Sequence, residues 1–185
     1  MHSLPLPQPD SIALQHSEHL RQRIIQRITQ SPSNDISFYD YMRMALYEPQ
    51  WGYYVAGAPI FGAKGDFTTA PEISALFSMC IAHQCIELFQ QLPHSTILEL
   101  GAGSGCMAAD ILCHLEQHHQ LPTHYYILEI SPSLRARQHA TISQKAPHLL
   151  TYVHWIDALP HAFEGIILGN EVIDAMPVEI ISYQQ

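Results

Sequence analysis

The residues of this chain whose spacing most directly indicates chemistry are three glycines at alternate positions, Gly101, Gly103 and Gly105. They follow the apolar run 96–100, in which Glu99 is the one acid, and they precede a pattern with the period of a helix. A strand that turns directly into a helix needs backbone angles that glycine adopts easily, and a missing Cβ lets a ligand approach the backbone. The segment therefore predicts a strand, a tight loop and a helix, with the loop as a ligand cradle.

The glycine spacing narrows the class of ligand. A dinucleotide fingerprint needs G-x-G-x-x-G, but Cys106 stands where its last glycine would fall, and a P-loop would need a lysine that this loop lacks. Glu99 before the first glycine favours a ligand with a positive group. The loop resembles motif I of the seven-stranded Rossmann-like methyltransferases, which holds S-adenosylmethionine (SAM), a cation without phosphate. The alternative is a glycine-rich turn that binds nothing.

The cofactor contacts predicted around this loop are Glu99, Gly101, Ala102, Gly103, Ser104 and Gly105.

Composition narrows the class of protein further. The 185 residues are 47% hydrophobic, which is ample for a buried core, and 8 basic against 17 acidic residues give a formal charge of −9. This balance, without a Lys/Arg cluster, argues against a nucleic-acid partner. No secretory signal or stretch long enough to span a bilayer is visible, so the sequence predicts a cytoplasmic protein without membrane insertion.

Histidines are frequent, and three of them fall close together. His114 and His118 are one helical turn apart, with His119 beside them, and such a pair could bind a metal. An exposed helix face is the favoured interpretation, so no metal site is predicted.

Helices are expected before the glycine loop. Apolar spacing predicts one helix from Ser11 to about Thr29 and a second from Ser37 through Leu46. A third is predicted from an N-cap at Thr69 to about Gln91. Its expected apolar face is Ile73, Leu76, Phe77, Cys80, Ile81, Leu88 and Phe89. The aromatic residues between positions 38 and 54 either pack in a core or form a wall over a ligand cleft.

Longer segments carry a more specific signal. They are F-Y-D-Y-M-R-M-A-L-Y-E-P-Q-W-G-Y-Y, G-D-F-T-T-A-P-E-I-S, I-L-E-L-G-A-G-S-G, I-L-E-I-S-P-S-L-R-A-R-Q and G-N-E-V-I-D-A-M-P-V. In this order they resemble the MidA family of SAM-dependent methyltransferases, whose mitochondrial members assist respiratory complex I assembly by dimethylating an arginine of a partner subunit. The resemblance implies a class I methyltransferase fold, a protein substrate, and a loop that closes over SAM. Contacts from that loop are expected at Gly65, Asp66, Thr69, Pro71 and Glu72.

Strands and helices alternate after the glycine loop, which predicts a parallel α/β sheet. The methyltransferase resemblance implies that its four strands lie in the order 3-2-1-4. The second strand is expected over 124–130, where Glu129, next to Ile130, can accept both ribose hydroxyls of the nucleoside. The third is expected over 149–154, and Asp157 after it stands where related enzymes often contact the adenine amino group. Either acid could instead be an ordinary exposed strand end or turn cap.

The fourth strand, predicted over 165–170, delivers Asn170, Glu171 and Asp174 to the carboxyl edge of the sheet. A carboxylate pair suits a guanidinium, because the planar fork can be held by two hydrogen bonds while its charge is offset. Methyl transfer is an in-line displacement, so the protein mainly positions donor and acceptor, and Glu171 or Asp174 is the candidate base. Capping of the loop is the alternative role.

Domain boundaries follow from these elements: an N-terminal helical region over 1–92 and an incomplete Rossmann-like SAM-binding region over 93–185. The family pattern continues beyond Val178, so we expect an inactive or weakly active fragment, with an apolar sheet edge at 166–168 that is open to pairing. The leading hypothesis is a protein arginine methyltransferase. The alternatives are a non-catalytic assembly module with the same cleft and, less favoured, a nicotinamide-dependent oxidoreductase.

Overall fold

The computed structural model describes residues 9–56, 68–92 and 94–183. The chain forms two compact units. The first comprises Met1–Ala56 with Met176–Gln185, and the second comprises Gly57–Ala175. The boundary predicted between residues 92 and 93 stays a prediction, and helices on both sides of it belong to the second unit.

Two helices build the first unit, and both were predicted from apolar spacing. Helix α1, Ser11–Gln30, begins after Asp10, whose Oδ1 accepts a hydrogen bond from the Ala13 N–H at 2.8 Å. Helix α2, Phe38–Tyr47, begins after Ser37, whose Oγ accepts from the Asp40 N–H at 3.0 Å. These side chains satisfy N–H groups that the first helical turn leaves without partners.

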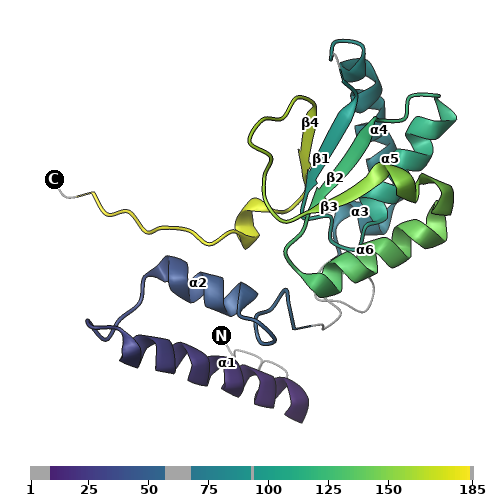
Figure 1. Cartoon of the computed structure of the whole chain (residues 1–185). Helices are drawn as coiled ribbons and strands as arrows, with labels where there is room; N and C mark the ends of the chain where they lie inside the picture. The colour runs from purple at the N-terminus through teal and green to yellow at the C-terminus, as the bar shows by residue number, and fades with distance from the viewer. Residues whose placement is uncertain (1–8, 57–67, 93, 184–185) are drawn as a thin grey trace, which may run out of the picture. The chain divides into compact units, whose positions relative to one another are not determined.

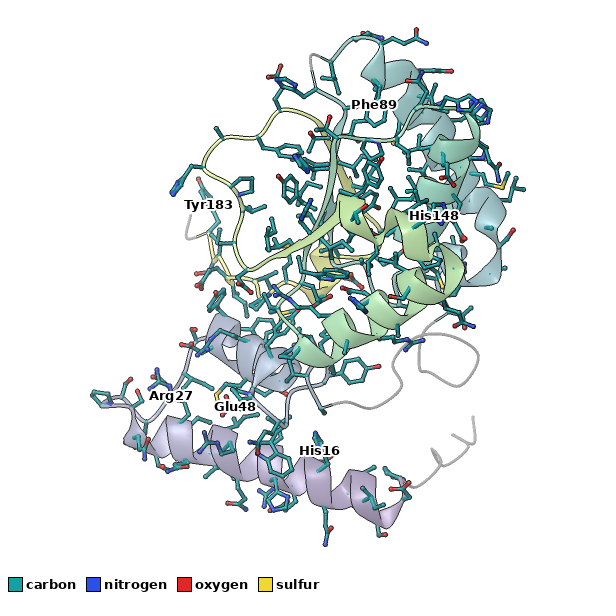
Figure 2. The ribbon with its side chains drawn as sticks, turned by 45° about the vertical axis from the view of Figure 1, so that its right-hand side comes forward. His16, Arg27, Glu48, Phe89, His148 and Tyr183 are labelled. Carbon is teal, nitrogen blue, oxygen red and sulfur yellow. The ribbon has the colours of Figure 1, made fainter. Side chains whose placement is uncertain are left out.

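Side chains hold α1 to the segment that follows α2. The Arg23 guanidinium lies 3.0 Å from the Glu48 carboxylate, and Nε2 of His16 lies 2.7 Å from the Trp51 carbonyl oxygen. Figure 2 labels His16 and Glu48. The Trp51 ring stacks on His19 with 4.5 Å between ring centroids. These contacts are those of packed aromatic residues, and a role as the wall of a ligand cleft stays a prediction.

The second unit is built on a four-stranded sheet (Figure 1). Its strands are β1 (Thr96–Leu100), β2 (His124–Leu128), β3 (Val153–Ile156) and β4 (Ile166–Gly169), all parallel, in the order β3-β2-β1-β4. The predicted fold class and strand order are confirmed. Because the carboxyl ends of parallel strands meet at one edge, this order brings the residues after β1, β2 and β4 together.

Helices α4 (Ala75–Phe89), α5 (Cys106–Gln117) and α6 (Pro132–Lys145) lie on one side of the sheet (Figure 1). Right-handed crossovers from β1 to β2 and from β2 to β3 place α5 and α6 there. On the covered face, Ile97 pairs with Tyr125 and with Ile166, and all three are buried. On the opposite face Ile167 of the edge strand β4 is 56% exposed.

The third predicted helix is interrupted, and its predicted apolar face is partly wrong. Helix α3, Ala70–Ile73, ends at Ser74, whose backbone is extended, and the Ser74 Oγ accepts from the Leu76 N–H at 3.1 Å to begin α4. The serine supplies an N-cap inside what otherwise looks like one helix. The residues of α4 that are buried are Ser78, Ala82, Cys85 and Phe89. Ile73, Leu76 and Leu88 of the predicted face are exposed.

The third strand also begins later than predicted. Residues Pro147–Tyr152 form a 3-10 helix, η1, and β3 follows it. A second such helix, η2, covers Ile173–Ala175 after β4. Among the residues that the structure describes, no helix combines the length and the apolar character that a bilayer crossing requires.

Candidate cofactor site

The glycine loop joins β1 to α5 as predicted. The Gly101 N–H donates to the Leu128 carbonyl oxygen at 3.0 Å, which fixes the start of the loop against the end of β2. Gly101, Gly103 and Gly105 have φ angles of 61°, 53° and 83°, a region that side chains with a Cβ rarely adopt. The three glycines are therefore required by the backbone itself.

Gly105 also has a packing role that the sequence did not reveal. A Cβ at this position would lie 2.9 Å from the Cα of Gln138, so the glycine allows α6 to approach the N-terminus of α5 closely. Gly105 does not line the pocket described next. The need for glycine at this position therefore follows from the backbone angle and from the approach of Gln138.

An open pocket, with about 420 Å³ of empty space that includes space open to solvent, lies over the glycine loop. Its lining residues are Thr69, Pro71, Glu72, Glu99, Gly101, Ala102, Gly103, Ser104, Met107, Asn170 and Glu171. Among the residues that the structure describes, the lining includes three carboxylates and no basic side chain. This lining fits a ligand that carries positive charge and no phosphate, because it offers no cation to a pyrophosphate and several acids to a sulfonium or ammonium group.

Glu99 is the most deeply buried of these acids. Its side chain is 1% exposed, and its Oε2 accepts a hydrogen bond from the Tyr125 hydroxyl at 2.8 Å. Burial raises the pKa of Glu99 to about 7; the Tyr125 hydrogen bond opposes this rise, and the nearby charge of Glu129 adds to it. Burial is also the first cause that raises the pKa of Tyr125 well above its ordinary value. A positive group in the pocket would favour the ionised form of Glu99.

Ser104 ties the glycine loop to the segment before α4. Its hydroxyl donates a hydrogen bond to Oε1 of Glu72, and its oxygen accepts from the Cys106 N–H at 3.3 Å. The segment of Thr69, Pro71 and Glu72 therefore forms one wall of the pocket. Gly65 and Asp66, which were predicted to contribute to the same loop, lie outside the described residues.

Glu129 is held beside the loop by a side chain that our sequence analysis did not select. The buried amide Nε2 of Gln138 donates to Oε2 of Glu129 at 2.9 Å and to the Gly103 carbonyl oxygen at 3.2 Å, and its Oε1 accepts from Nε1 of Trp155 at 2.9 Å. Oε1 of Glu129 accepts from the Ser131 N–H at 2.9 Å. Burial raises the pKa of Glu129, and these hydrogen bonds oppose that rise.

Glu129 is only 6% exposed and does not line the pocket, and neither do Ile130 and Asp157. Asp157 instead binds Arg135, whose guanidinium lies 2.6 Å from Oδ1 and also donates to the Glu129 and Ile156 carbonyl oxygens. The predicted contacts of Glu129 with ribose and of Asp157 with adenine stay predictions.

The residues after β4 provide the other wall of the pocket. Asn170 and Glu171 line it, whereas the exposed Asp174 in η2 does not. Glu171 has a φ of 52°, an unusual conformation for a residue with a side chain. Backbone strain of this kind concentrates at functional positions.

Two residues of the site were missed in the sequence. Met107 lines the pocket from the first turn of α5. Gln138 could have been found in the sequence. It lies four residues from both Leu134 and Ile142, on the buried face of the same helix. A polar residue on such a face indicates a hydrogen-bonding role.

A parallel sheet with a glycine loop after its first strand and an acid after its second is the architecture of nucleoside-binding α/β proteins, and the acidic pocket selects a cationic ligand within that class. Residues 80–185 match the family described as "Putative S-adenosyl-L-methionine-dependent methyltransferase". The chain belongs to this family. The predicted family resemblance and the predicted cofactor class are thereby confirmed.

Solved structures agree with this assignment. The chain aligns with a methyl transferase-like protein of Burkholderia thailandensis bound to S-adenosyl-homocysteine, at 40% identity and a TM-score of 0.86, over 94% of this chain and 46% of that protein. A native crystal structure of a related protein from the same organism gives 39% identity and a TM-score of 0.81, over 95% and 44% of the two chains.

Curated relatives include the mitochondrial protein arginine methyltransferase NDUFAF7 of Danio rerio, at 30% identity over 87% of this chain and 42% of the relative. The homolog of Drosophila melanogaster is 29% identical over 94% of this chain and 45% of the relative. The chain therefore spans less than half the length of these relatives. The predicted cytoplasmic location is contradicted, because both relatives are named mitochondrial.

Proposed function

We propose that this chain binds SAM in the pocket over the glycine loop and transfers its methyl group to an arginine of a partner protein. The observation that carries the proposal is the composition of that pocket, in which buried Glu99 and the glycine loop face Asn170 and Glu171 across one cavity. The names of the curated relatives support arginine as the acceptor and a protein as the substrate.

In this proposal the cofactor side uses groups that are already in place. Glu99 attracts the positive charge of the ligand, and the backbone of Gly101 and Gly103 lets the ligand approach without obstruction by a Cβ. Glu129, held by Gln138, accepts the ribose hydroxyls. The exposed apolar side chain of Ile130 offers a surface to the adenine.

SAM supplies an electrophilic methyl group on a sulfonium, and the chain supplies the positioning of the acceptor. Asn170 and Glu171 hold the guanidinium so that one nitrogen points at the methyl carbon, with Asp174 as a second acid on the same rim. Glu171 or Asp174 takes the proton that the attacking nitrogen loses. Dimethylation and a role in complex I assembly, which the family resemblance implies, stay predictions.

The first test is calorimetry with S-adenosyl-homocysteine, SAM and NADH on the 185-residue chain. We expect saturable binding of the first two and none of NADH. Absence of any binding of S-adenosyl-homocysteine would contradict the proposal, and preferential binding of NADH would revive the oxidoreductase alternative.

The second test follows labelled methyl groups from SAM into paired peptides that differ only by arginine or lysine at one position. We expect slow labelling of the arginine peptides, recovered as methylarginine after hydrolysis, and its loss in a Glu171→Gln, Asp174→Asn double variant. Cofactor binding without any labelling would favour the non-catalytic assembly module instead.

A further inference from the structure

A cluster of three histidines lies between α4 and α5, apart from the cofactor pocket. It consists of His83 from α4 and of His114 and His118 from successive turns of α5. One ring nitrogen from each residue can be chosen so that all three lie within 4.8 Å of one another. The ring centroids are 5.4 Å apart for His83 and His114, 5.5 Å for His83 and His118, and 4.6 Å for His114 and His118.

His114 is an unusual member of this cluster because it is buried. The side chain is 7% exposed, and neither ring nitrogen has a hydrogen-bond partner among the residues that the structure describes. A buried polar group without a partner costs free energy on the order of 1–3 kcal/mol, so such groups normally face a partner in the native protein. The two neighbouring imidazoles contact His114 through their rings and form no hydrogen bond with its ring nitrogens.

We propose that His83, His114 and His118 form a binding site for one transition-metal dication of the zinc type. Three imidazoles with a fourth position open to water are a known ligand set for Zn²⁺. Imidazole nitrogen suits Zn, Cu, Ni and Co, whereas Mg²⁺ and Ca²⁺ prefer oxygen ligands.

The distances permit this site after small side-chain movements. With Zn–N bonds of about 2.0–2.1 Å and tetrahedral angles, ligand nitrogens lie about 3.4 Å apart. Separations of up to 4.8 Å must therefore shorten by at most about 1.4 Å. His83 and His118 are exposed, so their side chains have room to adjust, whereas His114 is buried. One anchored ligand and two adjustable ones can close on an ion without movement of the helices.

The site would have a structural role. His114 stands seven residues beyond Met107 on the same helix, about 10 Å along the helix axis from the wall of the cofactor pocket. A metal ion bound there would clamp α4 to α5, because its ligands come from both helices. Binding of the cofactor should proceed with or without the ion, which separates this inference from the proposed function.

Calorimetry with ZnCl₂ on the metal-free 185-residue chain tests the site directly. We expect one saturable site in the wild-type chain and no comparable heat with MgCl₂. The chain contains 13 histidines, so background binding needs a matched variant. His119→Asn provides it, because this residue neighbours the cluster without belonging to it, and asparagine tolerates its φ of 56°.

The decisive variants are His83→Gln and His118→Gln, singly and together, since both residues are exposed and their loss should leave the fold intact. Loss of a supporting residue near a metal typically weakens binding about 10–100-fold, so loss of a direct ligand should weaken zinc binding at least about tenfold. Zinc should raise the melting temperature of the wild type and of His119→Asn, and not that of the double variant.

Equal zinc affinity and stoichiometry in the wild type and the double variant would overturn the proposal, as would the absence of a saturable site in the wild type. Binding of S-adenosyl-homocysteine measured on the same samples should be unchanged in all of them. A loss of that binding in the histidine variants would contradict the separation of the two sites.

Discussion

The two walls of the pocket use the same functional group in opposite environments. On the side of β1 and β2, Glu99 lines the pocket and Glu129 lies beside the glycine loop without lining it. Both are almost completely buried, and they accept hydrogen bonds from Tyr125, Ser131 and Gln138. On the side of β4, Glu171 is exposed and sits on a backbone with positive φ. One wall has buried, hydrogen-bonded carboxylates, and the other has a carboxylate that is open to solvent.

This difference matches the two substrates that a methyltransferase must hold. A small cofactor is recognised by groups that are already in position. The free-energy cost of burying these groups is offset when the protein folds and is not added when the cofactor binds. A protein side chain arrives with its own surface, and the acids that receive it can stay hydrated until that surface covers them. Variants of the buried wall should therefore change stability and cofactor binding together, whereas variants of the exposed wall should change neither by much.

The largest expected effect is at Gly105, which does not line the pocket but belongs to the loop whose Gly101 and Gly103 do. Gly105→Ala places a Cβ 2.9 Å from the Gln138 Cα in a residue with a φ of 83°, so we expect a loss of about 2–4 kcal/mol in the free energy of unfolding. Urea denaturation measures it. Gly101→Ala is the matched control, since it also has a positive φ but its Cβ would meet only the Val172 side chain at 3.7 Å, and it should cost about 1–2 kcal/mol. Equal losses in both variants would show that the contact with α6 is unimportant.

Glu99→Gln should stabilise the fold while it weakens cofactor binding. The pKa of Glu99 is raised from an ordinary 4.5 to about 7, so the penalty for ionising it is absent below about pH 4.5 and complete above about pH 7. At about pH 8 we expect the variant to be more stable by about 2 kcal/mol, less than the full linkage value because the new amide N–H₂ needs partners. At about pH 4.5 the two proteins should have similar stability.

Binding of SAM by the wild type should tighten as pH rises from about 6 to about 8, because deprotonation of Glu99 creates the charge that attracts the ligand. Binding by Glu99→Gln should be flat over this range and about tenfold weaker at the upper end. Calorimetry at several pH values measures both. A pH dependence that survives in the variant would assign it to another group.

Gln138→Met should lower stability by about 1–3 kcal/mol and weaken binding of S-adenosyl-homocysteine, since it removes the amide that joins Glu129 to the glycine loop. Thermal unfolding and calorimetry provide the two measurements. The control is Gln144→Met, an exposed position on the same helix, where both quantities should be unchanged. Normal cofactor affinity in Gln138→Met would mean that Glu129 keeps its position without this support.

The smallest effect is expected on the open wall. Glu171→Gly removes the strain of a positive φ and should raise the free energy of unfolding by about 0.5–1 kcal/mol, with cofactor affinity changed less than about twofold. Transfer of the methyl group to arginine peptides should fall. A large loss of cofactor affinity in this variant would contradict the inference that the wall after β4 does not bind the cofactor.

Much of the second unit was accessible from the sequence. Alternation of apolar strands with amphipathic helices predicted the parallel sheet, because it is visible in local periodicity, and the methyltransferase resemblance implied the strand order. The glycine loop and Glu99 were also predicted, because residues so close in sequence are necessarily close in space. Elements whose ends depend on competing local hydrogen bonds were missed, as at Ser74 and at η1.

The sequence by itself determined the class of fold, the family and the cofactor class. The sequence also shows Gln138, His83, His114 and His118, but only the tertiary structure decided which residues they contact. Gln138 acquires its role because α6 packs within reach of Gly103 and Glu129, and the histidines meet because α4 lies against α5. The physical reason is the same in each case: periodicity along the chain reports which face of an element is buried, whereas partners distant in sequence are chosen by packing.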